Sequence, residues 1–214
     1  IVMIFKNILR ILASYRFSLI KIISFELIYI FRGYKGNKFD FTDNNIMTDN
    51  IPCPYYFLVR IKKILQDNNF HTFLDMGCGS GRAIDFFNRN FSNKKFIGIE
   101  YFSSHNEYCR KIFKNQHNVR IVQANFIKSD FLQYDADCYF FNSPFRQSSD
   151  IAKIMGKIIN FNLRKRKIFF IFINIDNKII ESLKYIQCIE CCNINDRKGY
   201  SIYYLNNNQT KKFI

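Results

Sequence analysis

The stretch "FLDMGCGSGRAIDFF", residues 73–87, holds three of the chain's eight glycines within five positions. The apolar residues before the glycines predict the end of a buried strand, and the residues from Arg82 to Phe87 suit the start of a helix. Glycine adopts positive φ and has no side chain to obstruct a ligand, so a glycine-rich turn between strand and helix lets the backbone approach a ligand closely. The stretch therefore predicts a ligand-binding turn in an α/β fold.

Outward from this turn, apolar runs alternate with helical stretches. The runs that we expect to be strands are "TFLDM", "KFIGIE", "VRIVQA", "CYFFN", "KIFFIFIN", "IQCIECC" and "YSIYYL". Helices are expected at 82–90, 105–115 and 151–161, and a proline-started helix in "IPCPYYFLVRIKKIL". Alternating strands and helices indicate a parallel sheet, whereas the short polar segment "NINDRKG" between the last two runs indicates a terminal hairpin.

The first 50 residues predict an amphipathic helical extension and connector, ahead of one domain at 51–214. Five charged residues interrupt the apolar block at 1–31, so no uncharged run approaches the roughly 18–20 residues that span a bilayer. On a helical wheel most of the polar residues of this block lie on one side, and only Arg16 and Glu26 depart from this amphipathic pattern. Two placements stay open: docking on the domain's own core, or peripheral contact with an anionic membrane.

The formal net charge of +15 over 214 residues suggests a nucleic-acid or anionic-membrane partner. The same charge would also follow from an AT-rich coding sequence, which inflates Asn, Ile, Phe and Lys. No nucleic-acid-reading module is recognisable. Charge alone therefore leaves the partner open.

Seven cysteines include a C-x-x-C pair, Cys188 and Cys191, followed directly by Cys192. No second pair or histidine cluster completes a zinc site, so we expect no metal. On a strand, Cys188 and Cys191 would point to opposite faces. We expect buried free thiols and, with no secretory signal evident, a cytoplasmic location.

Two acidic residues stand at the ends of the first two predicted strands. Ligands of an open α/β sheet bind at the carboxyl ends of the strands, where the strand order reverses. Asp75 ends the first strand just before the glycine turn, and Glu100 ends the second, 19 residues after Gly81. A carboxylate in the latter position can accept hydrogen bonds from both hydroxyls of a ribose. The pair predicts a nucleoside site.

The glycine spacing is D-x-G-x-G-x-G, and the dinucleotide pattern G-x-G-x-x-G would need a glycine where Arg82 stands. Asp75 suits a cationic amino-acid group better than a pyrophosphate. This combination resembles motif I of the class I S-adenosylmethionine-dependent methyltransferases. The resemblance implies S-adenosylmethionine as cofactor and a Rossmann-like, doubly wound, seven-stranded, mostly parallel sheet. It also implies these cofactor-binding residues: Asp75, Gly77, Cys78, Gly79, Gly81, Glu100, Tyr101, Asn125 and Phe126. Tyr101 would pack on the adenine ring, and Asn125 would contact the adenine amine.

The fourth predicted strand ends in Asn142-Ser143-Pro144-Phe145. This looks like the N-P-P-Y/F motif of amino-methyltransferases, with Ser143 in place of the first proline. An asparagine carbonyl and a nearby backbone carbonyl can hold an exocyclic NH₂ with its lone pair toward the methyl group, while an aromatic ring stacks on the acceptor. The resemblance implies that Asn142, Pro144 and Phe145 act on a planar amine.

Residues 40–176 are also similar to poorly characterised bacterial class I methyltransferases. Those proteins show a "P-T-P-Y" entry segment, "FxDxGxGxGR", "IGVE" and a strand ending in "FFNPF". The counterparts here are Pro52-Cys53-Pro54-Tyr55, residues 73–82, Ile97-Gly98-Ile99-Glu100 and residues 140–145. All three prolines of the chain would then lie beside the site.

The sequence thus predicts a methyltransferase with an unidentified acceptor. One alternative is a catalytically silent domain that binds the cofactor and acts as a partner module. Another is O-methylation of a small molecule or glycan, which would require a base such as His105 or Asp150. An NAD-dependent oxidoreductase is disfavoured by the glycine spacing, and the retained Asn142 turn argues against the silent domain.

Overall fold

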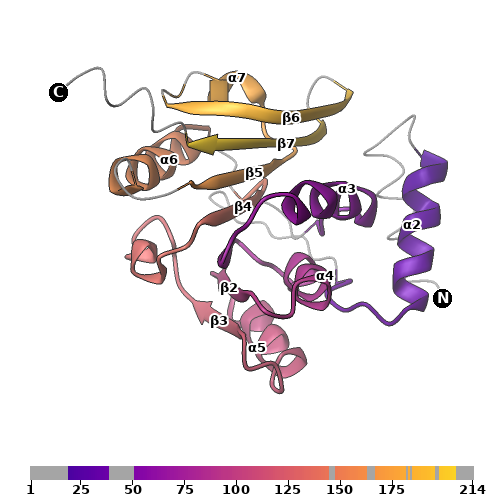
Figure 1. The fold of residues 1–214 in the computed structure, drawn as a ribbon. Helices are drawn as coiled ribbons and strands as arrows, with labels where there is room; N and C mark the ends of the chain where they lie inside the picture. Colours follow the sequence, from indigo (N-terminus) through magenta and orange to yellow (C-terminus); the bar gives the residue numbers. More distant parts are fainter. Residues whose placement is uncertain are drawn as a thin grey trace.

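The computed structural model of the chain describes residues 19–38, 51–144, 148–162, 167–181, 183, 185–195 and 198–205. A seven-stranded sheet in the order β3-β2-β1-β4-β5-β7-β6 forms its centre (Figure 1). The strands are β1 Thr72–Met76, β2 Lys95–Glu100, β3 Val119–Gln123, β4 Cys138–Asn142, β5 Phe169–Ile173, β6 Ile186–Asn195 and β7 Lys198–Leu205. All seven predicted strands are present.

The sheet is parallel from β3 to β5, and β7 runs antiparallel to both β5 and β6. The order of the strands reverses between β1 and β4, which lie side by side. The predicted mostly parallel, Rossmann-like sheet with a terminal hairpin is confirmed. Its topology places the carboxyl ends of β1 and β4 together at the switch point, where ligands of such sheets bind.

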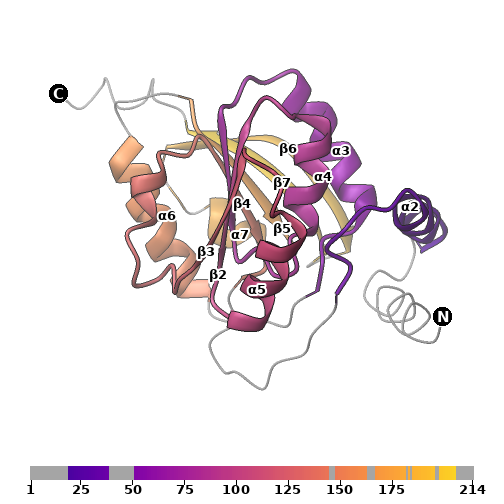
Figure 2. The same ribbon diagram turned by 90° about the horizontal axis from the view of Figure 1, so that it is seen from below.

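Helices cover both faces of the sheet (Figure 2). One side carries α3 Tyr55–Gln66, α4 Arg82–Asn90 and α5 Ser103–Ile112, with α2 Leu19–Phe31 beyond them. The other side carries α6 Ser148–Asn162 and the short α7 Asn177–Glu181. The helix at 82–90 was predicted to the residue, whereas α5 and α6 begin earlier than expected. Neither α7 nor the 3-10 turn Phe131–Tyr134 was predicted, because elements of four or five residues are too short to show a periodicity.

Two hydrophobic cores follow from the alternation of side chains along the central strands. Phe73 and Phe140 face the α3 and α4 side, in one buried cluster with Phe87. Their chain neighbours Leu74 and Phe141 belong to the second cluster, against α6. Both faces of the central strands are therefore buried, as expected of parallel strands covered by helices.

The helix α2 docks on the domain through a buried carboxylate. Glu26 is only 2% exposed, and its Oε2 lies 2.7 Å from Nη1 of Arg82 in an ion pair. Its Oε1 accepts a hydrogen bond of 2.8 Å from the backbone N–H of Tyr55, the first residue of α3. Glu26 interrupts the helical pattern in the sequence because it points into the protein. Of the two placements considered for the N-terminal block, residues 19–31 adopt the docked one, and residues 1–18 lie outside the described part of the chain.

The outer side of α2 carries exposed apolar side chains, Ile20 at 82% and Phe31 at 85% exposure. In the ranges that the structure describes, every helix is too short or too polar to cross a membrane.

Glu26→Gln tests the buried pair. Replacement of the carboxylate removes the negative charge of Glu26 from the buried Arg82 guanidinium, which costs on the order of 3–5 kcal/mol of unfolding free energy. Urea denaturation measures the loss. Lys153→Ala is the matched control, because Lys153 is 70% exposed and lies 3.7 Å from Asp150 in a surface pair worth less than about 1 kcal/mol. Equal losses in the two variants would contradict the anchoring role of Glu26.

Candidate cofactor and acceptor site

The glycine turn after β1 is formed as predicted. Gly77, Gly79 and Gly81 all have positive φ, at 92°, 52° and 81°. A Cβ on Gly81 would lie 2.7 Å from the Phe113 ring, so a side chain there would displace the start of α4. A Cβ on Gly77 would lie 3.2 Å from Cβ of Pro144. The turn after β1 therefore abuts the turn after β4, and glycine is needed for that approach.

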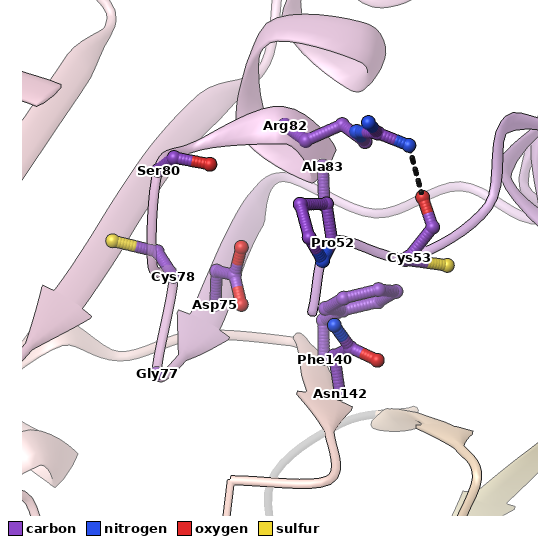
Figure 3. Close-up of a pocket in the computed structure, with 10 residues that line it drawn as sticks. All are labelled: Pro52, Cys53, Asp75, Gly77, Cys78, Ser80, Arg82, Ala83, Phe140 and Asn142. Atoms are coloured by element: carbon purple, nitrogen blue, oxygen red, sulfur yellow. Dashed lines mark hydrogen bonds between the residues drawn. The ribbon is translucent and has the colours of Figure 1, made fainter. Parts of the chain in front are cut away.

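A pocket with about 280 Å³ of empty space, which includes its open mouth, lies between the carboxyl ends of β1 and β4 (Figure 3). Its walls come from Pro52, Cys53, Asp75, Gly77, Cys78, Ser80, Arg82, Ala83, Phe140 and Asn142. Four predicted site residues meet there: Asp75, Gly77, Cys78 and Asn142. Ser80 and Arg82 were not predicted as site residues, although they lie inside the same glycine motif. Pro52 was expected only to lie beside the site.

Asp75 is the most unusual group in this pocket. It is 2% exposed, and its Oδ1 has no hydrogen-bond partner among the described residues. Burial, and secondarily the negative charge of Glu100, raise the pKa of the Asp75 carboxyl well above its usual range. An ionised carboxylate in this position is costly unless a cation or a hydrogen-bond donor reaches it. A ligand with a cationic group would therefore fit here.

Glu100 is tied to the glycine turn. Its Oε2 accepts a 2.7 Å hydrogen bond from the N–H of Gly79, and its Oε1 accepts one of 2.9 Å from Phe102. Each carboxylate oxygen has a second lone pair, so Glu100 can still accept from ligand hydroxyls. His105 is buried beside it, with Nδ1 3.9 Å from Oε1. The two acidic strand ends, Asp75 and Glu100, thus flank one turn.

The remaining predicted cofactor residues lie in three different settings. Tyr101 is 41% exposed, and its ring meets Phe102 edge-on at 5.3 Å, so one aromatic surface stays open for packing. Asn125 accepts the Ile127 N–H with its own Oδ1 at 3.0 Å, which leaves the second lone pair of that oxygen and the Nδ2 group for a ligand. Phe126 is 1% exposed and belongs to the core, where it supports Gly77 from beneath. Of these three residues, only Tyr101 and Asn125 therefore present side chains to a ligand.

The end of β4 is held by an unexpected contact. Nδ2 of Asn142 donates a 2.8 Å hydrogen bond to the carbonyl oxygen of Ile51, which orients Oδ1 as the remaining acceptor of the side chain. Ser143 has a φ of 44°, and its hydroxyl donates to Asn174 O at 2.9 Å. Proline cannot adopt that φ, so the turn differs in its backbone from an N-P-P motif. Pro144 is buried, and Phe145 lies outside the described residues.

Neither residue considered as a base lines the pocket. His105 lies beside Glu100, and Asp150 lies on α6 in its pair with Lys153. Among the residues that the structure describes, no cluster of three or more His, Cys, Asp or Glu could hold a metal ion.

An α/β sheet with a ligand pocket at its switch point defines a broad class of nucleotide-cofactor domains. Within that class, residues 73–161 match the family model described as a methyltransferase domain. No curated protein matches the chain. The match and the fold support a class I methyltransferase.

Solved methyltransferase structures share the fold. A protein from Staphylococcus aureus assigned as a caffeoyl-CoA O-methyltransferase has 17% identity and a TM-score of 0.61, over 86% of this chain and 92% of that one. An SAH-bound methyltransferase of Podospora anserina has 11% identity and a TM-score of 0.57, over 72% and 80%. A methyltransferase from Geobacter sulfurreducens has 13% identity and a TM-score of 0.56, over 70% and 77%. At these identities the likeness concerns the fold alone.

Asp75→Asn tests how much the buried carboxylate of Asp75 destabilises the ligand-free protein. The raised pKa means that the folded protein binds this proton more tightly than the unfolded chain, so the wild type loses stability as pH rises above about 4. The ligand-free Asn variant does not titrate there. It should melt about 2–4 °C higher than wild type at about pH 8, which corresponds to roughly 1 kcal/mol, and the gain should shrink toward about pH 4.5.

Asp137→Asn is the matched control. Asp137 is equally buried, but its carboxylate accepts hydrogen bonds of 2.8–3.0 Å from the N–H groups of His71 and Thr72. Its replacement should lower the melting temperature. A melting-temperature difference between Asp75→Asn and wild type that does not change with pH would refute the unpaired-carboxylate interpretation.

Proposed function

We propose that the chain is an S-adenosylmethionine-dependent methyltransferase that acts on a planar amine. One observation carries the proposal: the buried Asp75, with an unpartnered oxygen, and the oriented amide of Asn142 line the same pocket at the sheet's switch point. The family-model match over residues 73–161 supports the same chemistry.

In this proposal the residues of β1 and β2 hold the cofactor. Asp75 would receive its cationic amino group, which removes the cost of the unpaired buried carboxylate. Glu100 would accept from the ribose hydroxyls, and the turn through Gly77, Cys78, Gly79 and Gly81 would provide close backbone approach. Tyr101 would pack on the adenine ring, Asn125 would contact the adenine amine through the second lone pair of Oδ1, and Phe126 would support the turn. When bound, S-adenosylmethionine supplies an electrophilic methyl group on sulfur.

The residues that follow β4 would orient the acceptor. Oδ1 of Asn142 would accept an N–H of the substrate amine, while its Nδ2 remains bonded to Ile51 O. Pro144 shapes the turn against Gly77, and Phe145 would stack on the acceptor plane. Such an arrangement needs no strong base, because an amine already has a lone pair and gains from orientation and proximity. The positions of His105 and Asp150 therefore favour a nitrogen acceptor over an oxygen acceptor.

The acceptor itself is found by a screen. Purified protein and labelled S-adenosylmethionine are incubated with separate RNA, DNA, protein and small-molecule fractions. RNA and DNA are included because the net charge of +15 would favour binding to a polyanion. Label in none of the fractions, from protein that binds the cofactor, would favour the silent partner module.

Glu100→Ala should weaken binding of S-adenosylhomocysteine about 5- to 150-fold, because charge-assisted hydrogen bonds worth roughly 1–3 kcal/mol are lost. Isothermal titration measures the change, with NAD as the ligand expected not to bind. Glu107→Ala is the control, since it removes an exposed carboxylate from α5. Unchanged affinity in a folded Glu100→Ala protein would rule out the cofactor assignment.

Asn142→Ala should reduce turnover on the order of 10²-fold through misorientation of the reacting atoms, with little change in cofactor affinity. Phe145→Ala should mainly raise KM for the acceptor, and Phe145→Tyr should be tolerated. Asn115→Ala removes an exposed amide that does not line the pocket and serves as control. Full activity of Asn142→Ala on the identified acceptor would mean that the turn is only structural.

A further inference from the structure

Two cysteines near the C-terminus lie together because of an irregularity in β6. Cys188 pairs with Tyr203 and Glu190 with Ile202, so Ile189 is an extra residue in the strand. An extra residue reverses the alternation of faces, and Cys188 and Cys191 consequently share one face. Their Sγ atoms are 2.9 Å apart. The prediction that they point to opposite faces was wrong.

This pair is accessible, unlike most of the other thiols. β6 is the edge strand of the sheet, and both Cys188 and Cys191 are exposed. The prediction of buried free thiols is correct for four cysteines: Cys53, Cys78, Cys109 and Cys138. It was wrong for the C-x-x-C pair. A small molecule in solution can therefore reach this pair.

The opposite face of β6 holds the bulge in place. Glu190 bonds the hydroxyl of Tyr200, and its Oε1 lies 3.4 Å from Nη2 of Arg60 on α3. Arg60 Nε in turn donates to the Tyr200 hydroxyl at 2.7 Å. Cys192 faces this side and packs against the first core cluster. Glu190 stands between the two cysteines in the sequence. Its contacts with Arg60 and Tyr200 therefore stabilise the bulge that brings the two thiols together.

We propose that Cys188 and Cys191 form a redox-active dithiol that closes to an intramolecular disulfide by exchange with a small-molecule disulfide such as glutathione disulfide. In the first step one cysteine thiolate attacks the glutathione disulfide, forms a mixed disulfide and releases one glutathione thiolate. In the second, the other cysteine attacks the protein sulfur of that mixed disulfide and releases the second glutathione. The two protein thiol protons end on two glutathione thiols, and the protein has lost two electrons to the small disulfide.

The contact between the thiols also affects their reactivity. Partial burial of the Cys188 sulfur, followed by its contact with the Cys191 thiol, raises the pKa of Cys188 to about 12. Because the thiolate is the nucleophile, the exchange with the small disulfide should be faster at higher pH.

Mass spectrometry of the intact 214-residue chain tests the proposal without any assay of methyl transfer. The reduced protein is equilibrated with a mixture of reduced and oxidised glutathione, quenched with acid, alkylated and weighed. Wild type should lose the mass of two hydrogens and two alkylation sites relative to its reduced form. Cys192→Ser should behave identically. This variant removes the third thiol of the segment 188–192, which carries the pair.

Cys188→Ser and Cys191→Ser should not lose the two hydrogens, and each should carry one glutathione adduct instead. Circular dichroism checks that each variant is folded. Three outcomes would overturn the proposal: adducts without an internal disulfide in wild type, a disulfide that disappears in Cys192→Ser, or a disulfide that persists when Cys188 or Cys191 is replaced.

Discussion

The buried ion pair between Glu26 and Arg82 is the contact on which the rest of the site depends. Arg82 is the first residue of α4, directly after the glycine turn, and the same carboxylate accepts the N–H of Tyr55 at the start of α3. The residue before α3, Pro54, offers no side-chain cap, so a carboxylate from α2 satisfies that helix terminus and complements its positive dipole end. One side chain thereby sets the starting points of two helices relative to the ligand turn. The net energy of such a pair is modest, because desolvation offsets much of the attraction, but the geometry that it enforces is specific.

Aromatic packing extends this constraint. The Arg82 guanidinium lies 4.5 Å from the centre of the Tyr55 ring, and Tyr29 of α2 stacks on that ring at 4.9 Å. The segment after α2 then runs over the glycine turn, where Ser80 donates to Gly36 O at 2.7 Å and Lys35 N–H donates to Asp85 at 2.8 Å. Residues 34–38 therefore cover the outside of the turn, and Pro52 and Cys53 line the pocket. Residues 34–38, which were expected to belong to a connector, thus support the site from outside.

Much of the fold follows from local properties of the sequence. Apolar runs and helix periodicity identified all seven strands and the helix at 82–90, because strands buried on both faces read as continuous apolar runs of five or six residues. Asp75 and Glu100 were identifiable because strand ends in such sheets meet at one edge, so their side chains converge whatever the details of packing. The candidate residues Asp75, Gly77, Cys78 and Asn142 accordingly meet in one pocket.

The sequence by itself determined the succession of strands and helices along the chain. It also identified the acidic and glycine residues at the strand ends. Both features depend on short-range patterns of residues. Only the tertiary structure decided that Glu26 is a buried anchor, because the identity of its partner depends on the approach of a helix 56 residues away in the chain. It likewise decided the bond from Asn142 to Ile51 O and the left-handed backbone of Ser143. The bulge at Ile189 is the clearest case. One residue of register decides which face a strand side chain occupies, and register is set by the partner strand and by the contacts of Glu190 with Arg60 and Tyr200, not by the residues of β6 alone.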